Sequence, residues 1–188
     1  ATVMKVERLY EQGNSTSWPY FAFVELQRGS TLSSVQASLN DDVRIEMSAG
    51  SPVAKPEPIT FVSGGYLKML GGRAAIGRTL DPADDLPGAS PVVVLSDAFW
   101  KHRFNGDAGV VGRTIKLGAG TVTVAGVLQK KFTGPSDRTP SFWAPFASYG
   151  AIYGPPVTST SAMQVQVIAR TPAGAAASAA QDELSSVA

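Results

Sequence analysis

Three side chains that could form a hydrolytic triad lie close together in the sequence: Ser96, Asp97 and His102. A serine hydrolase needs the hydroxyl, the imidazole and the carboxylate within hydrogen-bond reach of one another. On a helix, Asp97 and His102 would lie about 140° apart and would not face each other. No Gly-x-Ser-x-Gly elbow surrounds Ser96. We therefore expect Ser96 or Asp97 to cap a helix and His102 to lie on the surface.

A second candidate is the acidic stretch formed by Asp81, Asp84 and Asp85, close to Gly88, which could suggest a calcium loop. The spacing D-x-x-D-D lacks the alternating oxygen ligands and the terminal glutamate of such a loop. We expect a solvated acidic loop that caps a short turn instead.

A third candidate is the glycine pair Gly118 and Gly120, which supplies half of a G-x-G-x-x-G phosphate motif. The third glycine position is occupied by Thr123, and the segment lies between two predicted strands. A phosphate cradle needs helix N–H groups behind the glycines, so the pattern predicts a hairpin turn.

The remaining candidates are aromatic and basic residues. Trp100 and Phe104 have helical spacing and are expected in the core, whereas Arg103 falls inside the same apolar arc. Its stem could extend along the apolar surface, or its guanidinium could pair with Asp107. Trp143 stands beside a proline-rich loop, where either a core position or an exposed platform is open.

Composition narrows the chemistry further. The 188 residues include no cysteine and one histidine, which excludes disulfides, thiolate sites and a multi-histidine metal cage. A net charge of +1 gives no electrostatic footprint for nucleic acid. Fifteen acidic residues supply no distinctive pair for a glycosidase. The sequence thus predicts a non-enzymatic protein without a cofactor.

The elements that must position these residues alternate irregularly. Helices are expected to start near Pro19, at Tyr66, after Ser96 and beyond Pro172. The following ranges are expected as strands: 43–47, 57–62, 91–95, 113–117, 121–127, 142–146 and 163–170. Such a mixture without regular βαβ repeats predicts an α+β fold.

One stretch needs a separate explanation. Residues 139–169 carry no charge and are long enough to cross a membrane, but prolines such as Pro155 and Pro156 would break a helix. We expect a loop with two strands attached. The first ten residues have no apolar core, so no signal peptide is expected at this end.

An ordered series of motifs in the middle of the chain is similar to a known family. It comprises "VSGGYLKMLGGRAAIGRTL" (62–80), "SPVVVLSDAFWKHRFNGDAGVVGRTIKLGAGTVTVAGV" (90–127) and "FWAPF" (142–146), with "SWPYFAFVELQ" and "QVQVIARTPAG" in the flanks. The series resembles the periplasmic core domain of macrolide-exporter-type (MacB-like) ABC permeases. Gly118-Ala119-Gly120 departs from the Asn-Gly hairpin that relatives usually carry.

The resemblance implies two lobes: a porter-like α/β lobe from residues 1–58 and 150–188, and a small inserted mixed α/β lobe from residues 59–149. It also implies a periplasmic domain of an inner-membrane permease that transmits ATP-driven motion for efflux or lipoprotein export. The implied partners are a second permease copy, a cytoplasmic ABC ATPase and a periplasmic adaptor.

An alternative function is an extracytoplasmic module that binds a hydrophobic small molecule or a lipid. Its pocket would lie near Trp143 and the loop that contains Tyr149 and Tyr153, and these three residues are the candidate partner or ligand surface. A hydrolase that uses Ser96 is a third hypothesis.

Overall fold

The computed structural model of the chain describes the following residues: 3–5, 8–10, 13–15, 17–29, 34–46, 55–135, 138–158 and 160–170. The chain divides into two compact units. Unit 1 is Ala1–Leu39 together with Thr158–Ala188, and unit 2 is Asn40–Val157. The lobe boundaries at 58/59 and 149/150 that the resemblance implies stay a prediction.

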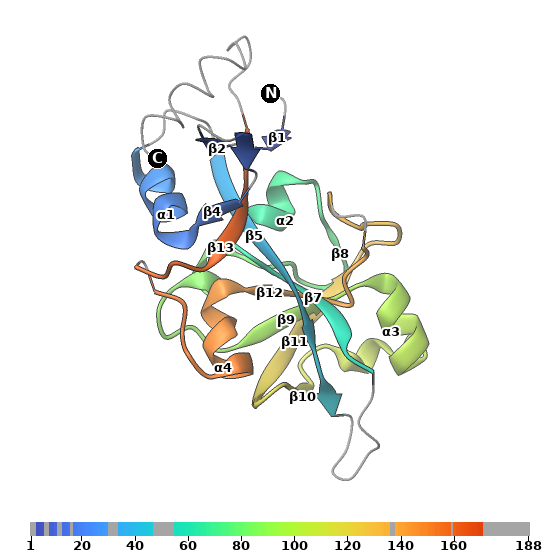
Figure 1. Ribbon diagram of the computed structural model, residues 1–188. Helices are drawn as coiled ribbons and strands as arrows, with labels where there is room; N and C mark the ends of the chain where they lie inside the picture. The colour runs from blue at the N-terminus through green and yellow to red at the C-terminus, as the bar shows by residue number, and fades with distance from the viewer. Residues whose placement is uncertain are drawn as a thin grey trace. The chain divides into compact units, whose positions relative to one another are not determined.

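Unit 1 is built around one strand from the C-terminal part of the chain. Its elements are β1 (Val3–Lys5), β2 (Arg8–Tyr10), β3 (Gly13–Ser15), β4 (Ser17–Pro19), α1 (Tyr20–Gly29), the first part of β5 (Ser34–Val43) and β13 (Gln164–Arg170). Strand β13 pairs antiparallel with β5 on one side and with β1 and β4 on the other, whereas β2 and β3 form a separate hairpin. Strand β13 therefore lies between β5 on one side and β1 and β4 on the other (Figure 1).

The core of unit 1 follows from its periodicities. Phe23 and Leu26 recur at the spacing of one helix face and are buried, as is Trp18 on β4. Val165 and Val167 alternate with exposed glutamines along β13, so one face of that strand faces the core.

Unit 2 contains a mixed sheet with helices on both of its faces. Its elements are the end of β5, β6 (Ile45–Glu46), β7 (Glu57–Val62), α2 (Tyr66–Met69), β8 (Ala74–Gly77), η1 (Pro82–Asp85), β9 (Val92–Leu95), α3 (Asp97–Phe104), η2 (Ala108–Val110), β10 (Thr114–Leu117), β11 (Gly120–Leu128), β12 (Phe142–Pro145), η3 (Phe146–Ser148) and α4 (Tyr149–Tyr153). The pairs β7–β12 and β9–β11 are parallel, and β12–β9, β11–β10, β11–β8 and β10–β6 are antiparallel.

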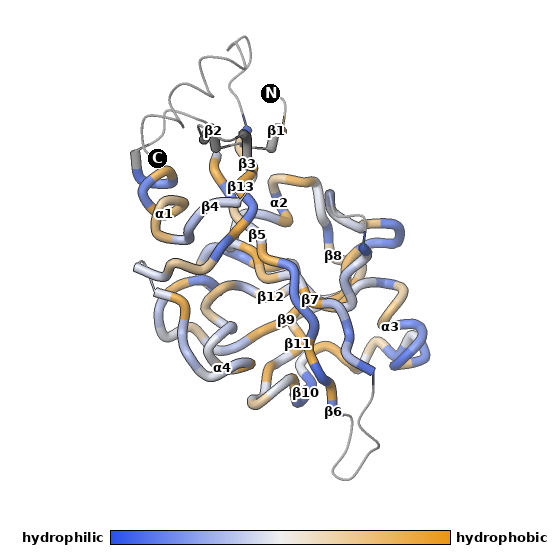
Figure 2. Tube along the Cα trace, viewed as in Figure 1, coloured by the Kyte–Doolittle hydropathy of each residue, from blue (hydrophilic) through white to orange (hydrophobic). Residues whose placement is uncertain are grey.

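The central strands of this sheet are buried along their whole length. All four residues of β9 and all four of β12 are buried. Figure 2 shows hydrophobic residues gathered on the strands and hydrophilic ones along much of α3. A continuous apolar strand with both faces covered was predicted for residues 91–95, and the structure confirms it.

Side-chain alternation along β12 shows which helix covers which face. Phe142 and Trp143 are neighbours on a strand and so point to opposite faces. Phe142 packs on Phe99 of α3 with ring centroids 4.6 Å apart, whereas Trp143 packs near Tyr66 of α2 at 6.3 Å. Helices α3 and α2 therefore cover opposite faces of the sheet.

The hairpin between β10 and β11 rests against α4. The N–H of Ala119 donates to the carbonyl of Ile152 over 2.9 Å. A Cβ at Gly118 would overlap the Ile152 carbonyl, and a Cβ at Gly120 would overlap that of Ala151. Two glycines stand here because the helix backbone leaves no room for side chains.

The predicted mixture of helices and strands is confirmed, with several differences in detail. The helix after Ser96 and the hairpin of β10 and β11 are present. Strand β8, most of β5 and helix α4 were not predicted, so residues 139–169 hold a helix as well as two strands. The helix expected beyond Pro172 lies outside the described residues.

Candidate functional site

The structure does not bring the three predicted surface residues together. Trp143 is only 1% exposed, because β12 is buried on both faces, so its indole offers no platform. Its ring packs against Phe132, with centroids 5.7 Å apart, on the α2 face of the sheet. The core position was the correct alternative for this tryptophan.

Tyr149 and Tyr153 lie on the other face. Phe61 pairs in register with Ala144, whose side chain points away from that of Trp143, and the Phe61 ring is 5.0 Å from Tyr149 and 5.8 Å from Tyr153. A ligand could not touch Trp143 and the two tyrosines in one pocket of unit 2. The pocket proposed for the ligand-binding alternative is therefore not formed by these residues.

The two tyrosines have a structural role in the described part of the chain. The hydroxyl of Tyr153 donates to the backbone carbonyl of Asp42 over 2.9 Å. Burial and the negative charge of Asp41 raise the pKa of both phenols above the ordinary value. Neither phenol is thus poised to release a proton near neutral pH.

The residues of the hydrolase hypothesis serve a helix. Ser96 Oγ accepts the N–H of Phe99 over 3.3 Å and so caps α3, as expected. The carboxylate of Asp97 pairs with Lys101 one turn later, at 2.8 Å. His102 is exposed on the same helix and has no hydrogen bond to either residue.

The acidic stretch is also occupied by structural contacts. Asp81 caps η1 by accepting the N–H of Ala83 over 3.0 Å, which confirms the predicted cap. The expectation of a solvated loop is wrong for Asp84, whose side chain is buried. Asp84 is held by Arg78 through two hydrogen bonds of 2.6 and 2.7 Å. Asp85 accepts the N–H of Ala147 at the start of η3 over 2.9 Å. The three carboxylates thus bind three different partners within the protein and do not converge on one site where a calcium ion could bind.

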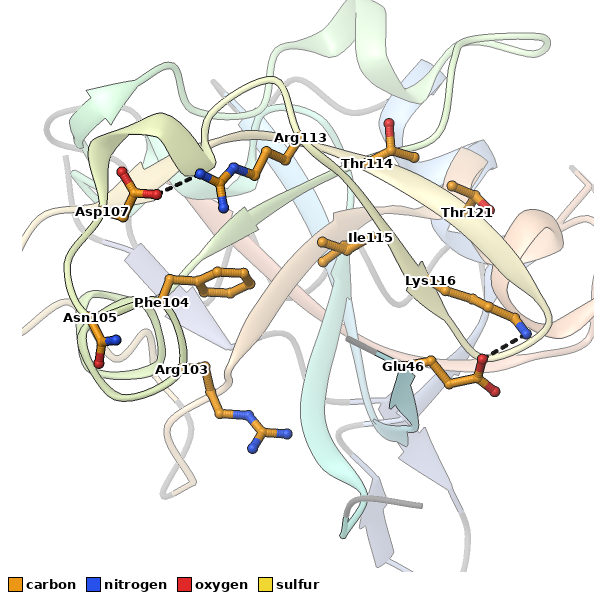
Figure 3. A pocket seen from close by; sticks show the side chains of 10 residues that line it. All are labelled: Glu46, Arg103, Phe104, Asn105, Asp107, Arg113, Thr114, Ile115, Lys116 and Thr121. Atoms are coloured by element: carbon orange, nitrogen blue, oxygen red, sulfur yellow. Dashed lines mark hydrogen bonds and ion pairs between the residues drawn. The ribbon is translucent and has the colours of Figure 1, made fainter. Parts of the chain in front are cut away.

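One open groove in unit 2 gathers charged side chains from separate elements. It has a volume of about 770 Å³ and lies along α3, β10 and β11. The groove is lined by Glu46, Arg103, Phe104, Asn105, Asp107, Arg113, Thr114, Ile115, Lys116 and Thr121 (Figure 3). Apolar and charged side chains therefore share one surface.

Two ion pairs stand at different parts of this groove. Arg113 Nη2 lies 2.6 Å from Asp107 Oδ2, and Lys116 Nζ lies 2.9 Å from Glu46 Oε2. All four side chains are about half exposed, so each pair is weak, about 0.2–1 kcal/mol. Both acidic residues of the groove, Asp107 and Glu46, are nevertheless already paired with a basic side chain.

The third basic side chain of the groove, Arg103, forms no ion pair with a described residue. Its Nε is buried and makes no hydrogen bond to any described residue. The pairing with Asp107 that the sequence left open is not formed, because Asp107 pairs with Arg113 and accepts the N–H of Gly109 over 2.9 Å. In Figure 3 no dashed line reaches the guanidinium of Arg103.

Sequence reasoning found Arg103 but not the groove. Arg103 was noticed because it falls inside the apolar arc of α3, and that signal is local. Glu46 and Lys116 are 70 residues apart and meet only through the pairing of β6 with β10. No periodicity along the chain predicts that meeting.

The described residues hold no metal-ligating cluster of three or more histidine, cysteine or acidic side chains. Among the same residues, no helix is long and apolar enough to cross a bilayer. The arrangement in the groove suits binding of an anionic group rather than covalent chemistry, since it offers cations and no activated nucleophile.

Comparisons with known proteins point to one family. The sequence matches the model of the MacB-like periplasmic core domain over residues 2–187. No curated protein matches the chain in sequence.

Two solved structures share the fold. The periplasmic region of MacB from Actinobacillus actinomycetemcomitans aligns with a TM-score of 0.73 and 15% identity, over 98% of this chain and 81% of that chain. The extracellular domain of the noncanonic ABC-type transporter YknZ from Gram-positive bacteria aligns with a TM-score of 0.72 and 15% identity, over 97% of this chain and 90% of that chain. Because the family model spans nearly the whole sequence and the fold agrees, the chain belongs to the MacB-like periplasmic core domain family and is a periplasmic domain of a MacB-like ABC transporter permease.

Proposed function

We propose that this domain is a non-catalytic transmitter of motion in an inner-membrane ABC permease. ATP-driven movement of the associated ABC ATPase would shift the domain on the periplasmic side, and the outcome would be efflux or the export of a lipoprotein. The observation that carries the proposal is the family match over residues 2–187. The structural assignments of Ser96, Asp97 and the acidic stretch support it, because they leave no catalytic set among the described residues.

The proposal includes an assembly. The full-length permease works as a homodimer, with the cytoplasmic ATPase on one side of the membrane and a periplasmic adaptor docked on this domain. The porter-like lobe, residues 1–58 and 150–188, and the inserted lobe, residues 59–149, are the parts that would move. On this view the full-length gene encodes an apolar stretch of about 20 residues on each side of the chain.

Movement can be measured with one spin label per permease subunit. The chain contains no cysteine, so Ala98→Cys, at an exposed position on α3, creates a unique attachment point in this domain. In the reconstituted full-length transporter, the distance between the two labels is expected to change between the nucleotide-free and the ATP-bound state. An ATPase variant that binds ATP without hydrolysing it should hold the ATP-bound distance.

Two results would contradict the proposal. One is the same distance distribution in every nucleotide state, measured in a transporter whose ATPase is active. The other is polar sequence on both sides of the domain in the full-length gene. A second label, at the exposed position Lys130→Cys of unit 2, tests whether the distance change is confined to α3.

A further inference from the structure

We propose that a basic patch on unit 2 binds the anionic headgroups of the phospholipid bilayer that holds the permease. The patch consists of Lys68, Arg73, Lys130 and Lys131, and apolar side chains adjoin it. Membership of the family makes the chain a domain of a membrane permease, so a bilayer is part of its surroundings. The inference goes beyond the proposed transmission of motion and does not depend on it.

The four basic residues come from separate segments that hydrogen bonds hold together. The N–H of Gln129, just after β11, donates to the carbonyl of Arg73, just before β8, over 2.8 Å. Lys130 and Lys131 follow directly. Lys68 is on α2, and the turn that leads from α2 to β8 accepts a hydrogen bond from the side chain of Gln129 over 3.5 Å. All four side chains therefore start from one small region, where the turn after α2 lies beside the segment after β11 (Figure 1).

The charges of this patch are exposed and unbalanced. All four residues are exposed, and none forms an ion pair with a residue that the structure describes. The whole chain is nearly neutral, with 16 basic and 15 acidic residues, so four unpaired cations are a local excess. Like charges gathered in this way repel one another and do not stabilise the fold, whereas a negatively charged membrane surface attracts all four at once.

An apolar hollow adjoins the cations. It has a volume of about 340 Å³, is open to solvent, and is lined in part by Leu70, Phe132 and Pro135. Lys131 also lines it, and the described lining residues include no acid. Basic side chains beside leucine and phenylalanine are the combination with which amphipathic elements rest on the headgroup region of a bilayer.

The backbone of Lys131 does not account for its side chain. Its φ is 67°, in the left-handed region, which glycine or asparagine adopts at a lower cost than lysine does. Strained backbone of this kind occurs at sites where a side chain has a function. Contact with a headgroup gives a lysine at this position a role that the fold does not.

Phosphate headgroups suit the patch better than an acidic protein segment does. Carboxylates are matched by the planar fork of arginine, which binds them through two parallel hydrogen bonds. Three of the four cations are lysines, whose ammonium is a compact point charge on a flexible stem and binds phosphate without a fixed geometry. Such side chains can follow headgroups that move in the plane of the bilayer.

Vesicle flotation measures the binding of the 188-residue chain. We expect it to bind vesicles of equal parts phosphatidylglycerol and phosphatidylcholine, and not vesicles of phosphatidylcholine alone. Binding should be lost at about 1 M salt, where the Debye length is ~3 Å. Lys130→Gln combined with Lys131→Gln should weaken binding about 25-fold, because each basic residue near an anionic surface contributes about fivefold.

The matched control is Arg44→Gln combined with Lys55→Gln, which removes the same charge from unit 2. Both residues are exposed and form no ion pair with a described residue. Lys55 precedes β7 whereas α2 follows it, and the carbonyl of Arg44 accepts the N–H of Gly118 at the other end of β11 from Lys130. This variant should bind anionic vesicles within about twofold of the natural chain.

A fluorescent label locates the contact. Because the chain has no cysteine, Thr133→Cys creates one attachment point, at an exposed position in the hollow. An environment-sensitive dye at this position should shift its emission to the blue with anionic vesicles. The same dye at Ala98→Cys, on α3 and thus on the opposite face of the sheet from α2, should not shift.

Three results would overturn the proposal: equal binding of the patch variant and the control variant, equal binding to neutral vesicles, or no shift of the dye at Thr133→Cys. A chain that binds a capped hexaglutamate peptide through the patch, but no vesicles, would also overturn it, because the patch would then dock a protein. Thermal unfolding of each variant shows that a loss of binding is not a loss of fold.

Discussion

Arg78 and Asp84 form an ion pair in unit 2 through two hydrogen bonds of 2.6 and 2.7 Å. Burial raises the pKa of Asp84, but the hydrogen bonds from Arg78 and from the N–H of Asp81, with the charge of Arg78, lower it below the ordinary value. Asp84 is 9% exposed, whereas about half of the Arg78 side chain faces solvent. The pair therefore stabilises the folded state at neutral pH, and this contribution is lost as pH falls through the folded pKa.

We expect Arg78→Gln to lower the free energy of unfolding at pH 7 by about 1–3 kcal/mol, because Asp84 keeps its charge in a buried place. Arg113→Gln is the matched control: it removes an exposed pair and should cost less than about 1 kcal/mol. Urea unfolding of the two variants measures both. Equal losses would show that the burial of Asp84 does not matter.

Asp85 has the opposite pH dependence. Burial raises its pKa to about 6, against the hydrogen bonds from the N–H groups of Ala147, Gly64 and Phe146, which lower it. Its folded pKa lies above the unfolded value, so its favourable contribution is fully present below about pH 4 and is lost as pH rises through 6.

Asp85→Asn should remove this dependence. The free energy of unfolding of the natural chain minus that of the variant is expected to fall by about 2–3 kcal/mol between pH 4 and pH 7. Taking the difference cancels carboxylates such as Asp84 that titrate in both proteins. Urea unfolding at four pH values measures it, and a difference that rises with pH would contradict the assignment.

At the scale of elements, the contact between β8 and β11 depends on glycines that face each other. Gly77 pairs in register with Gly126. A Cβ on Gly126 would come within 2.7 Å of the nitrogen of Arg78 and the carbonyl oxygen of Ile76, both backbone atoms that cannot move aside singly. Gly77 lies in the segment 62–80 and Gly126 in the segment 90–127 of the motif series quoted above, and the role of both glycines here is close packing of two strands.

Gly126→Ala should destabilise the chain by about 1–3 kcal/mol, as overpacking in a tight core does. Gly109→Ala makes a fair control, since its nearest neighbours are the ends of the exposed Asp107 and Arg113 side chains. Thermal unfolding compares the two variants. If both lost the same stability, the strand contact would not be the cause.

The elements also show what the sequence can and cannot predict. The alternation in residues 113–117 and the cap at Ser96 are local signals, and the structure has strand β10 and helix α3 at the positions that they predict. Strand β5 contains Asn40, Asp41 and Asp42, residues typical of turns, and its first half is a strand because β13 pairs with it. Helix α4 is short and contains a glycine, so its own propensity is weak and its contacts with Phe61 support it.

The candidate site follows the same division. Arg103 is visible in the sequence as an arginine within an apolar arc, but the residues that leave it unpaired lie on other elements. Tyr149 and Tyr153 lie on adjacent turns of helix α4. Trp143 lies on strand β12, whose side chains alternate between the two faces of the sheet. The predicted ligand surface grouped these three residues because they are close in the sequence, but they lie on opposite faces of the sheet.

At the scale of the whole molecule, the described surface offers little for stable self-association. Large apolar side chains are exposed at Phe21 and Leu86, one in each unit, and a stable dimer needs a contiguous apolar area. We expect the isolated chain to be a monomer of 19.6 kDa in analytical ultracentrifugation. Twice that mass at micromolar concentration would show that the domain dimerises without the rest of the permease.

The strand order has a consequence for synthesis on the ribosome. Strands β1, β4 and β5 come early in the chain, yet each pairs with β13, whose last residue is Arg170. The pairs within unit 2 are complete once β12 has emerged. Unit 2 can therefore fold while the ribosome is still elongating, whereas β1 and β4 wait for a segment made near the end. Because the domain is periplasmic, chaperones on the periplasmic side of the membrane would meet those open strand edges first.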